Sequence, residues 1–216
     1  IFHHTYPLNG RPALQLLGAD FGAFGVGVFF VVSGYLVTES YRRSGDAGRY
    51  LAKRALRIWP GLVVSLILTA VALGPLVTAL PYGDYFADPQ WALYILRNTL
   101  LYPVTYDLPG VFVANPAYGV NGSLWTLRLE FSCYLGVALL GITGRLTPCV
   151  IAVAAAAAAL VALLLGFLRP DLTVGPGFRL LMLAARFGFL FLAGALLQVR
   201  GRPPKLWLVA VSAALL

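Results

Sequence analysis

The sequence predicts an all-α fold, a polytopic bundle of transmembrane helices that forms a single domain over residues 1–216. The first observation is composition, because 60% of the residues are hydrophobic and only 11% are charged. A soluble domain is closer to half apolar and a quarter charged. The second is a mean hydropathy of +0.83. The third is that the apolar residues gather in stretches of about 20, the length that crosses a bilayer as a helix. These observations indicate an integral membrane protein.

Five complete spans are predicted, together with the end of an earlier helix and the start of a seventh. The five are residues 21–40, 60–80, 122–141, 148–168 and 176–198. Pro60 suits the first turn of the second span. The apolar start before Pro7 is interpreted as the last turn of a helix, and a further apolar run begins near Leu206. We therefore expect both ends to be cut within a longer protein.

The basic residues predict the orientation of the bundle. Ten of the sixteen lie in three loops, 41–59, 142–147 and 199–205. The alternate loops, 5–20, 81–121 and 169–175, are poor in basic residues. The positive-inside rule places the first set in the cytoplasm and the second set outside. The net charge of +8 is then mainly topological, and no nucleic-acid partner is expected.

The long outer loop contains an amphipathic segment, residues 88–102. It could lie in the membrane interface, since it combines an apolar face with aromatic residues. A packed re-entrant segment is an equal alternative. The two cysteines, Cys133 and Cys149, are interpreted as small apolar residues rather than as a disulfide or a metal site.

Three charged residues fall inside predicted spans, namely Arg128, Glu130 and Arg186. Such charges are functional candidates because they are costly within lipid. Glu130 shares a helix face with Ser123 and is expected to face the bundle interior. Arg128, two positions away, points about 200° round the helix and needs another partner. A structural ion pair between spans is the alternative for each charge.

Two further stretches are candidates for ligand contact. The glycine-rich "GVGVFFVVSGYL" includes Ser33 and Gly34, which could serve helix packing or the close approach of a ligand. In "RYLAKRALRIWP", Arg54 and Arg57 share a face of a short helix beside the membrane. Arginine suits phosphate because its planar guanidinium donates paired hydrogen bonds. A lipid-headgroup anchor is the alternative.

The two histidines of the chain, His3 and His4, stand side by side near its start. A histidine can accept and return a proton near neutral pH, which makes it a candidate general base. A structural hydrogen-bonding role is the alternative.

Four stretches, in order, resemble the membrane acyltransferase 3 family, whose members O-acylate sugars of cell envelopes and natural products. They are "FHHTYPLNG", "GAFGVGVFFVVSGYL", "KRALRIWP" and "NGSLWTLRLEFSCYL", and they lie within residues 1–140. The run "H-T-Y-P-L" fits His4 to the family histidine. The arginine that precedes this histidine in the family would lie before Ile1.

The resemblance implies a multi-pass enzyme of a bacterial inner membrane that transfers an acyl group, commonly acetyl, from acyl-CoA to a carbohydrate or lipid-linked glycan. His4 would be the general base and Glu130 would orient a histidine or hydroxyl. Arg54 and Arg57 would bind the CoA phosphates. The remaining candidates for substrate contact are Ser33, Gly34, Ser123 and Trp125. No bound cofactor or metal is expected, since a thioester already has a good leaving group.

Two other classes of protein remain open. A secondary transporter would also have broken helices and buried charges. A structural membrane protein would tolerate apolar replacements of Arg128, Glu130 and Arg186.

Overall fold

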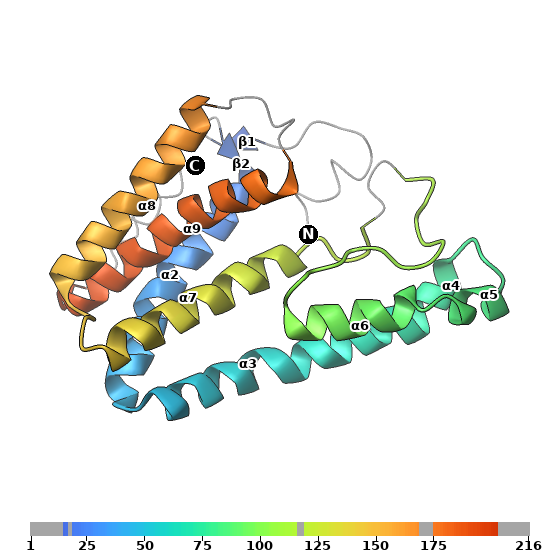
Figure 1. Cartoon of the computed structure of the whole chain (residues 1–216), viewed down its shortest axis with the longest axis horizontal. Helices are drawn as coiled ribbons and strands as arrows, with labels where there is room; N and C mark the ends of the chain where they lie inside the picture. Colours follow the sequence, from blue (N-terminus) through green and yellow to red (C-terminus); the bar gives the residue numbers. More distant parts are fainter. Residues whose placement is uncertain (1–14, 17–18, 116–118, 169–174, 203–216) are drawn as a thin grey trace. The chain divides into compact units, whose positions relative to one another are not determined.

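The computed structural model describes residues 15–16, 19–115, 119–168 and 175–202, and these residues are mainly helical (Figure 1). Five of the helices are long and apolar enough to cross a membrane. Their spanning segments are Gly22–Ser44, Ala47–Val77, Leu124–Ile142, Pro148–Phe167 and Gly177–Val199. The predicted all-α fold and its five complete spans are therefore confirmed.

The chain divides into two compact units. Among the described residues, the first unit contains those within 52–128, and the second contains those within 15–51 and 129–202. Two helices contribute residues to both units, α3 (Ala47–Ile67) and α7 (Leu124–Ile142). The single domain over residues 1–216 stays a prediction.

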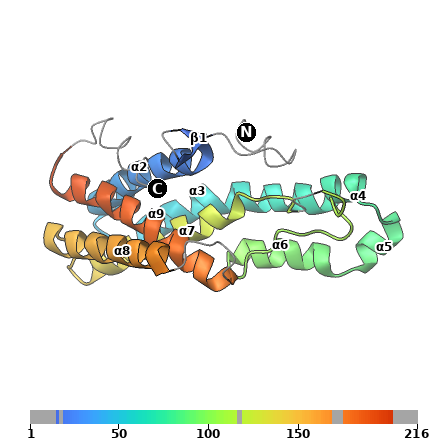
Figure 2. The same cartoon turned by 90° about the horizontal axis from the view of Figure 1, so that it is seen from above.

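Three helices lie entirely within the second unit. A pair of two-residue antiparallel strands, β1 (Gln15–Leu16) and β2 (Ala19–Asp20), leads into α2 (Phe21–Ser44). The other two helices are α8 (Pro148–Leu168) and α9 (Pro176–Val199). Helix α9 packs against both α2 and α8 (Figures 1 and 2).

Two glycines set the close approach of α2 to α9. A Cβ added to Gly34 would overlap the backbone carbonyl of Phe191, and one added to Gly194 would overlap the carbonyl of Val31. Small residues let helix backbones approach closely where apolar burial cannot drive association. The glycine-rich stretch in the sequence is thus explained, at Gly34, by helix packing.

The basic ends of three helices gather at one end of the second unit. The Arg42 guanidinium donates a hydrogen bond of 3.2 Å to the Gln198 side-chain oxygen, which joins the ends of α2 and α9. The Tyr41 ring lies against Gly141, which brings in the end of α7. Basic residues cluster at these ends and in the turns beyond, namely Arg42, Arg43, Arg145, Arg200 and Arg202. This grouping agrees with the predicted cytoplasmic side.

The second apolar helix is longer than the sequence predicts. Helix α3 continues through η2, a π-helix at Leu68–Leu73, into α4 (Gly74–Val77). The expected start at Pro60 is wrong, because Pro60 lies inside α3. A proline removes one backbone donor, and the good helix formers that precede it extend the helix back to Ala47. The span of 31 residues is about 46 Å long, against about 30 Å for a bilayer core.

The π-helix arises where Pro75 interrupts the ladder of backbone hydrogen bonds. The Gly74 amide donates to the Thr69 carbonyl, five residues back. In this wide pattern the Ala70 carbonyl would need the amide of Pro75, which has none. The hydroxyl of Tyr85, on α5 (Tyr82–Ala87), donates to Ala70 instead, at 2.7 Å. Gly74 leaves room for it, because a Cβ there would overlap the Tyr85 hydroxyl.

The amphipathic segment at residues 88–102 forms α6 (Gln90–Leu100), which packs beside η2 (Figure 1). Its last turn reaches α3, where the Trp59 indole donates to the Thr99 carbonyl at 3.0 Å. Of the two interpretations of residues 88–102, the structure therefore supports the packed segment.

The chain then returns in extended form to the end of the apolar helix. Asn98, fully buried, pins the turn because its side-chain amide exchanges hydrogen bonds of 2.8 and 3.0 Å with the backbone of Thr105. Val111 pairs with Thr78 in an isolated antiparallel bridge. Residues 79–111 thus form a hairpin of the first unit.

Candidate functional site

A buried carboxyl group lies in the second unit. Glu130 on α7 is only 7% exposed. Its Oε1 accepts hydrogen bonds from the Ser33 hydroxyl of α2, at 3.5 Å, and from the Tyr134 hydroxyl one helical turn further along α7. Both described hydrogen bonds fall on the same carboxylate oxygen. Two residues that the sequence singled out, Ser33 and Glu130, are therefore brought together.

Two buried tyrosines support this carboxyl group. Tyr134 is 1% exposed, and its backbone carbonyl accepts a hydrogen bond of 3.2 Å from the hydroxyl of Tyr50, in the first turn of α3. The Tyr50 ring in turn packs edge-on against Tyr41, with 5.3 Å between ring centroids. Helical spacing places Tyr134 on the face of Glu130. No pattern in the sequence identifies Tyr50, whose partner is 84 residues away.

The other predicted contact residues have local roles that the structure describes. Gly34 faces the backbone of Phe191. Ser123 precedes α7, where its hydroxyl donates to the Asn121 side chain at 2.6 Å and its carbonyl accepts from the Thr126 hydroxyl. Trp125, in the first turn of α7, is half-buried. Neither His3 nor His4 lies within the described residues.

The candidate arginines of the first unit, Arg54, Arg57 and Arg128, lie on α3 and α7. Arg54 is half-buried and Arg57 is exposed. Both lie on α3, the helix that forms the second candidate span. The Arg128 guanidinium lies over the ring of Tyr102, 5.4 Å from its centroid, just beyond the end of α6. This contact supplies the partner that the sequence required for Arg128. In the second unit, Arg186 is half-buried within α9.

Burial shifts the pKa values of two tyrosines in the hairpin of residues 79–111. Loss of solvent raises the pKa of the Tyr85 hydroxyl. Burial, with a smaller effect of Tyr85, raises the pKa of Tyr94 on α6 to about 12. Both hydroxyls therefore stay protonated at neutral pH, and Tyr85 remains a donor to Ala70.

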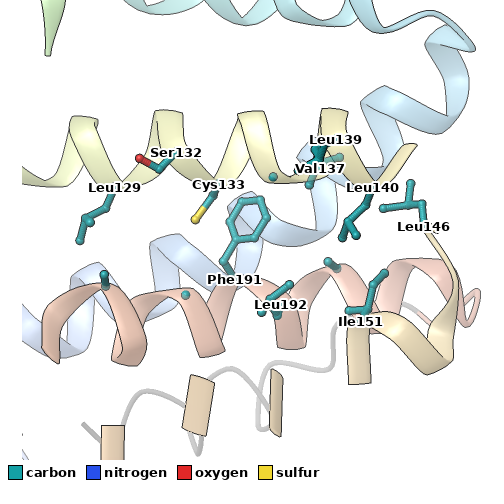
Figure 3. Close-up of a pocket in the computed structure, with 14 residues that line it drawn as sticks. Leu129, Ser132, Cys133, Val137, Leu139, Leu140, Leu146, Ile151, Phe191 and Leu192 are labelled. Carbon is teal, nitrogen blue, oxygen red and sulfur yellow. The ribbon is translucent and has the colours of Figure 1, made fainter. Parts of the chain in front are cut away.

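An apolar pocket of about 400 Å³ opens beside α7 in the second unit (Figure 3). Its lining comes from α7, α8, α9 and the turn before α8, and includes Leu129, Ser132, Cys133, Val137, Leu140, Leu146, Ile151, Phe191 and Leu192. The Phe191 ring points from α9 toward Cys133 of α7 (Figure 3). Cys133 carries a free thiol. The described residues contain no group of three or more metal-ligating side chains.

The model of the acyltransferase 3 family, described as an acyltransferase domain, matches residues 1–216. The chain belongs to the acyltransferase 3 family. The resemblance noted in the sequence is thus confirmed, and it extends beyond the four motifs. This membership and the five apolar helices show a multi-pass membrane protein.

Two curated relatives are similar to part of the chain. The O-acetyl transferase of Shigella phage Sf6 is 38% identical over 141 residues, which are 63% of this chain and 40% of the relative. Nodulation protein 10 of Rhizobium leguminosarum bv. viciae is 38% identical over 149 residues, 64% of this chain and 37% of the relative. The matched part thus spans about two-fifths of each relative. No solved structure matches the chain significantly.

Proposed function

We propose that the protein is a membrane O-acyltransferase that moves an acyl group, acetyl above all, from acyl-CoA to a hydroxyl of a carbohydrate or cell-envelope glycan. The observation that carries the proposal is Glu130, a carboxyl group buried within a membrane span and held by two hydroxyls. Buried ionisable groups in spans mark functional sites by default. Membership of the acyltransferase 3 family and a relative named O-acetyl transferase support the choice of chemistry.

The reaction needs one base and help for the developing oxyanion. His4 removes the proton of the acceptor hydroxyl, whose oxygen attacks the thioester carbonyl carbon. The carbon–sulfur bond breaks, and the CoA thiolate leaves and takes up the proton. Glu130 orients the histidine or the hydroxyl, with Ser33 beside it. Hydrogen-bond donors near the carbonyl oxygen stabilise the tetrahedral intermediate.

The donor is proposed to bind through its phosphates at Arg54 and Arg57. These guanidinium groups are three residues apart on α3, one half-buried and one exposed. A guanidinium binds phosphate oxygens in pairs, which suits the CoA diphosphate. Gly34, Ser123 and Trp125 remain candidates for substrate contact. The proposed location is the inner membrane of a bacterium.

The proposed reaction is tested with the intact protein in proteoliposomes that contain a glycan acceptor. We expect acetyl-CoA to acetylate the acceptor, with one free CoA thiol released for each ester formed. A transporter would instead move the glycan across the bilayer without acetyl-CoA. Flux without ester formation would overturn the proposal in favour of that alternative.

The donor site is tested by replacing Arg54 and Arg57 singly with glutamine. Each change should raise the KM for acetyl-CoA, because a charge-assisted hydrogen bond to phosphate contributes about 1.5–3 kcal/mol. Arg145→Gln is the matched control, since Arg145 is an exposed arginine of the turn between α7 and α8. An unchanged KM in both Arg54→Gln and Arg57→Gln would remove the phosphate-binding role.

A further inference from the structure

The two hydrogen bonds to Glu130 are distributed unevenly. Ser33 and Tyr134 both donate to Oε1, and no described residue donates to Oε2. A carboxylate can accept at both oxygens. The arrangement therefore occupies one oxygen within the protein and leaves the other to receive a further donor.

Tyr134 is the better anchored of the two donors. Its side chain is 1% exposed, and the i, i+4 spacing on α7 aims its hydroxyl at Glu130. The Tyr50 hydroxyl donates to its backbone carbonyl from α3. Tyr50 is itself fully buried. Ser33, on α2, donates over 3.5 Å, at the outer limit for a hydrogen bond.

We propose that Tyr134 is the positioning residue of Glu130, which engages Oε1 so that Oε2 is presented to the reacting histidine or hydroxyl, while Tyr50 fixes Tyr134 in place. This inference rests on the proposed function, in which Glu130 orients the reacting group. Tyr134 does not touch substrate in this account. It acts by restricting the orientation of the carboxyl group, and small errors in such geometry are expensive in rate.

The first test is Tyr134→Phe in the intact protein, assayed for acetyl transfer. The ring and its packing remain, whereas the donor to Oε1 is lost. We expect kcat to fall about 10-fold to 100-fold, with the KM for acetyl-CoA unchanged, because only the reacting geometry is affected. Tyr41→Phe is the matched control. Its ring contacts Tyr50 and Gly141, but its hydroxyl has no role in this account.

The second test separates positioning from packing. Fluorotyrosines with one or two ring fluorines, placed at residue 134, keep the shape of the side chain and strengthen its hydroxyl as a donor. We expect kcat to change progressively with phenol acidity at residue 134 and to stay constant for the same substitutions at residue 41. A kcat that does not depend on phenol acidity at residue 134 would overturn the inference. Wild-type kinetics in Tyr134→Phe would also overturn it.

Glu130→Gln distinguishes this inference from the proposed function. If Glu130→Gln abolishes transfer while Tyr134→Phe is as active as the wild type, the proposed function stands and the positioning role fails. If Glu130→Gln retains full activity, the role of Glu130 fails, and the positioning role fails with it.

Discussion

The hydroxyl of Tyr85 donates a hydrogen bond to the carbonyl oxygen of Ala70, with 2.7 Å between the two oxygens. This carbonyl lacks a backbone donor because the residue five positions on is Pro75. The short helix α5 therefore completes the backbone hydrogen bonding of a candidate membrane span. A buried carbonyl without a donor would cost about 1–3 kcal/mol.

Tyr85→Phe should lower the free energy of unfolding by about 1–3 kcal/mol, because it strands the Ala70 carbonyl. Tyr94→Phe is the matched control, since the Tyr94 hydroxyl is buried and has no hydrogen-bond partner among the described residues. Its removal should be neutral or stabilising. Thermal unfolding of the intact protein in detergent measures both variants. Equal stability losses in the two variants would contradict the role given to Tyr85.

Alkaline pH should destabilise the fold through Tyr94. Its pKa is raised from 10.0 to about 12 in the folded protein. The folded state thus favours the protonated phenol, and this contribution to stability is fully present below pH 10 and is lost as pH rises toward 12. We expect the unfolding temperature to fall over that interval, and to fall less in Tyr94→Phe. A wild-type tyrosinate absorbance that titrates entirely near pH 10 would refute the shift.

Gly34→Ala and Gly194→Ala should each separate α2 from α9. Each new Cβ meets a backbone carbonyl of the facing helix, which cannot turn aside as a side chain would. Overpacking of this kind costs about 1–3 kcal/mol. Gly25→Ala, on the same helix as Gly34, meets open space and should be neutral or stabilising. Unfolding measurements that rank Gly25→Ala with the other two would contradict the packing account.

Tyr102→Phe should preserve stability, whereas Tyr102→Leu should reduce it. The Arg128 guanidinium lies over the Tyr102 ring, and a phenylalanine ring can still attract the cation. This contact is expected to contribute about 0.5–2 kcal/mol. The two variants are compared by urea titration of the intact protein. Identical midpoints for Tyr102→Leu and the wild type would remove Tyr102 as the partner of Arg128.

Much of this fold is predictable from the sequence because hydropathy reports directly on membrane spans. The glycine-rich α2, the alanine-rich α8 and the basic residues at the helix ends can all be recognised from the sequence composition. Pro60 misleads, since a proline suits a first turn yet is also tolerated inside a long helix. The sequence does not decide the place of residues 88–102, because an amphipathic segment fits a membrane interface and a packed groove equally well.

The candidate site is only partly predictable for a related reason. Glu130 stands out because a charge in a span is costly. Helical spacing in the sequence also places Tyr134 on the same face as Glu130. Tyr50 could not be predicted, because its contact with Tyr134 joins residues 84 positions apart. The role of Tyr85 as a donor to Ala70 is equally unpredictable, since only the folded hairpin brings Tyr85 to the π-helix.

The central claim is that Glu130 takes part in acyl transfer, and Glu130→Gln in the intact protein tests it most directly. The measurement is the rate of acetyl transfer from acetyl-CoA to a glycan in proteoliposomes. Glu39→Gln makes the same chemical change at the chain's other glutamate, which pairs with Arg43 on α2 at 2.6 Å. The account predicts a loss of about 100-fold or more for Glu130→Gln and wild-type rates for Glu39→Gln. A Glu130→Gln protein that folds normally and transfers acetyl at the wild-type rate would contradict it.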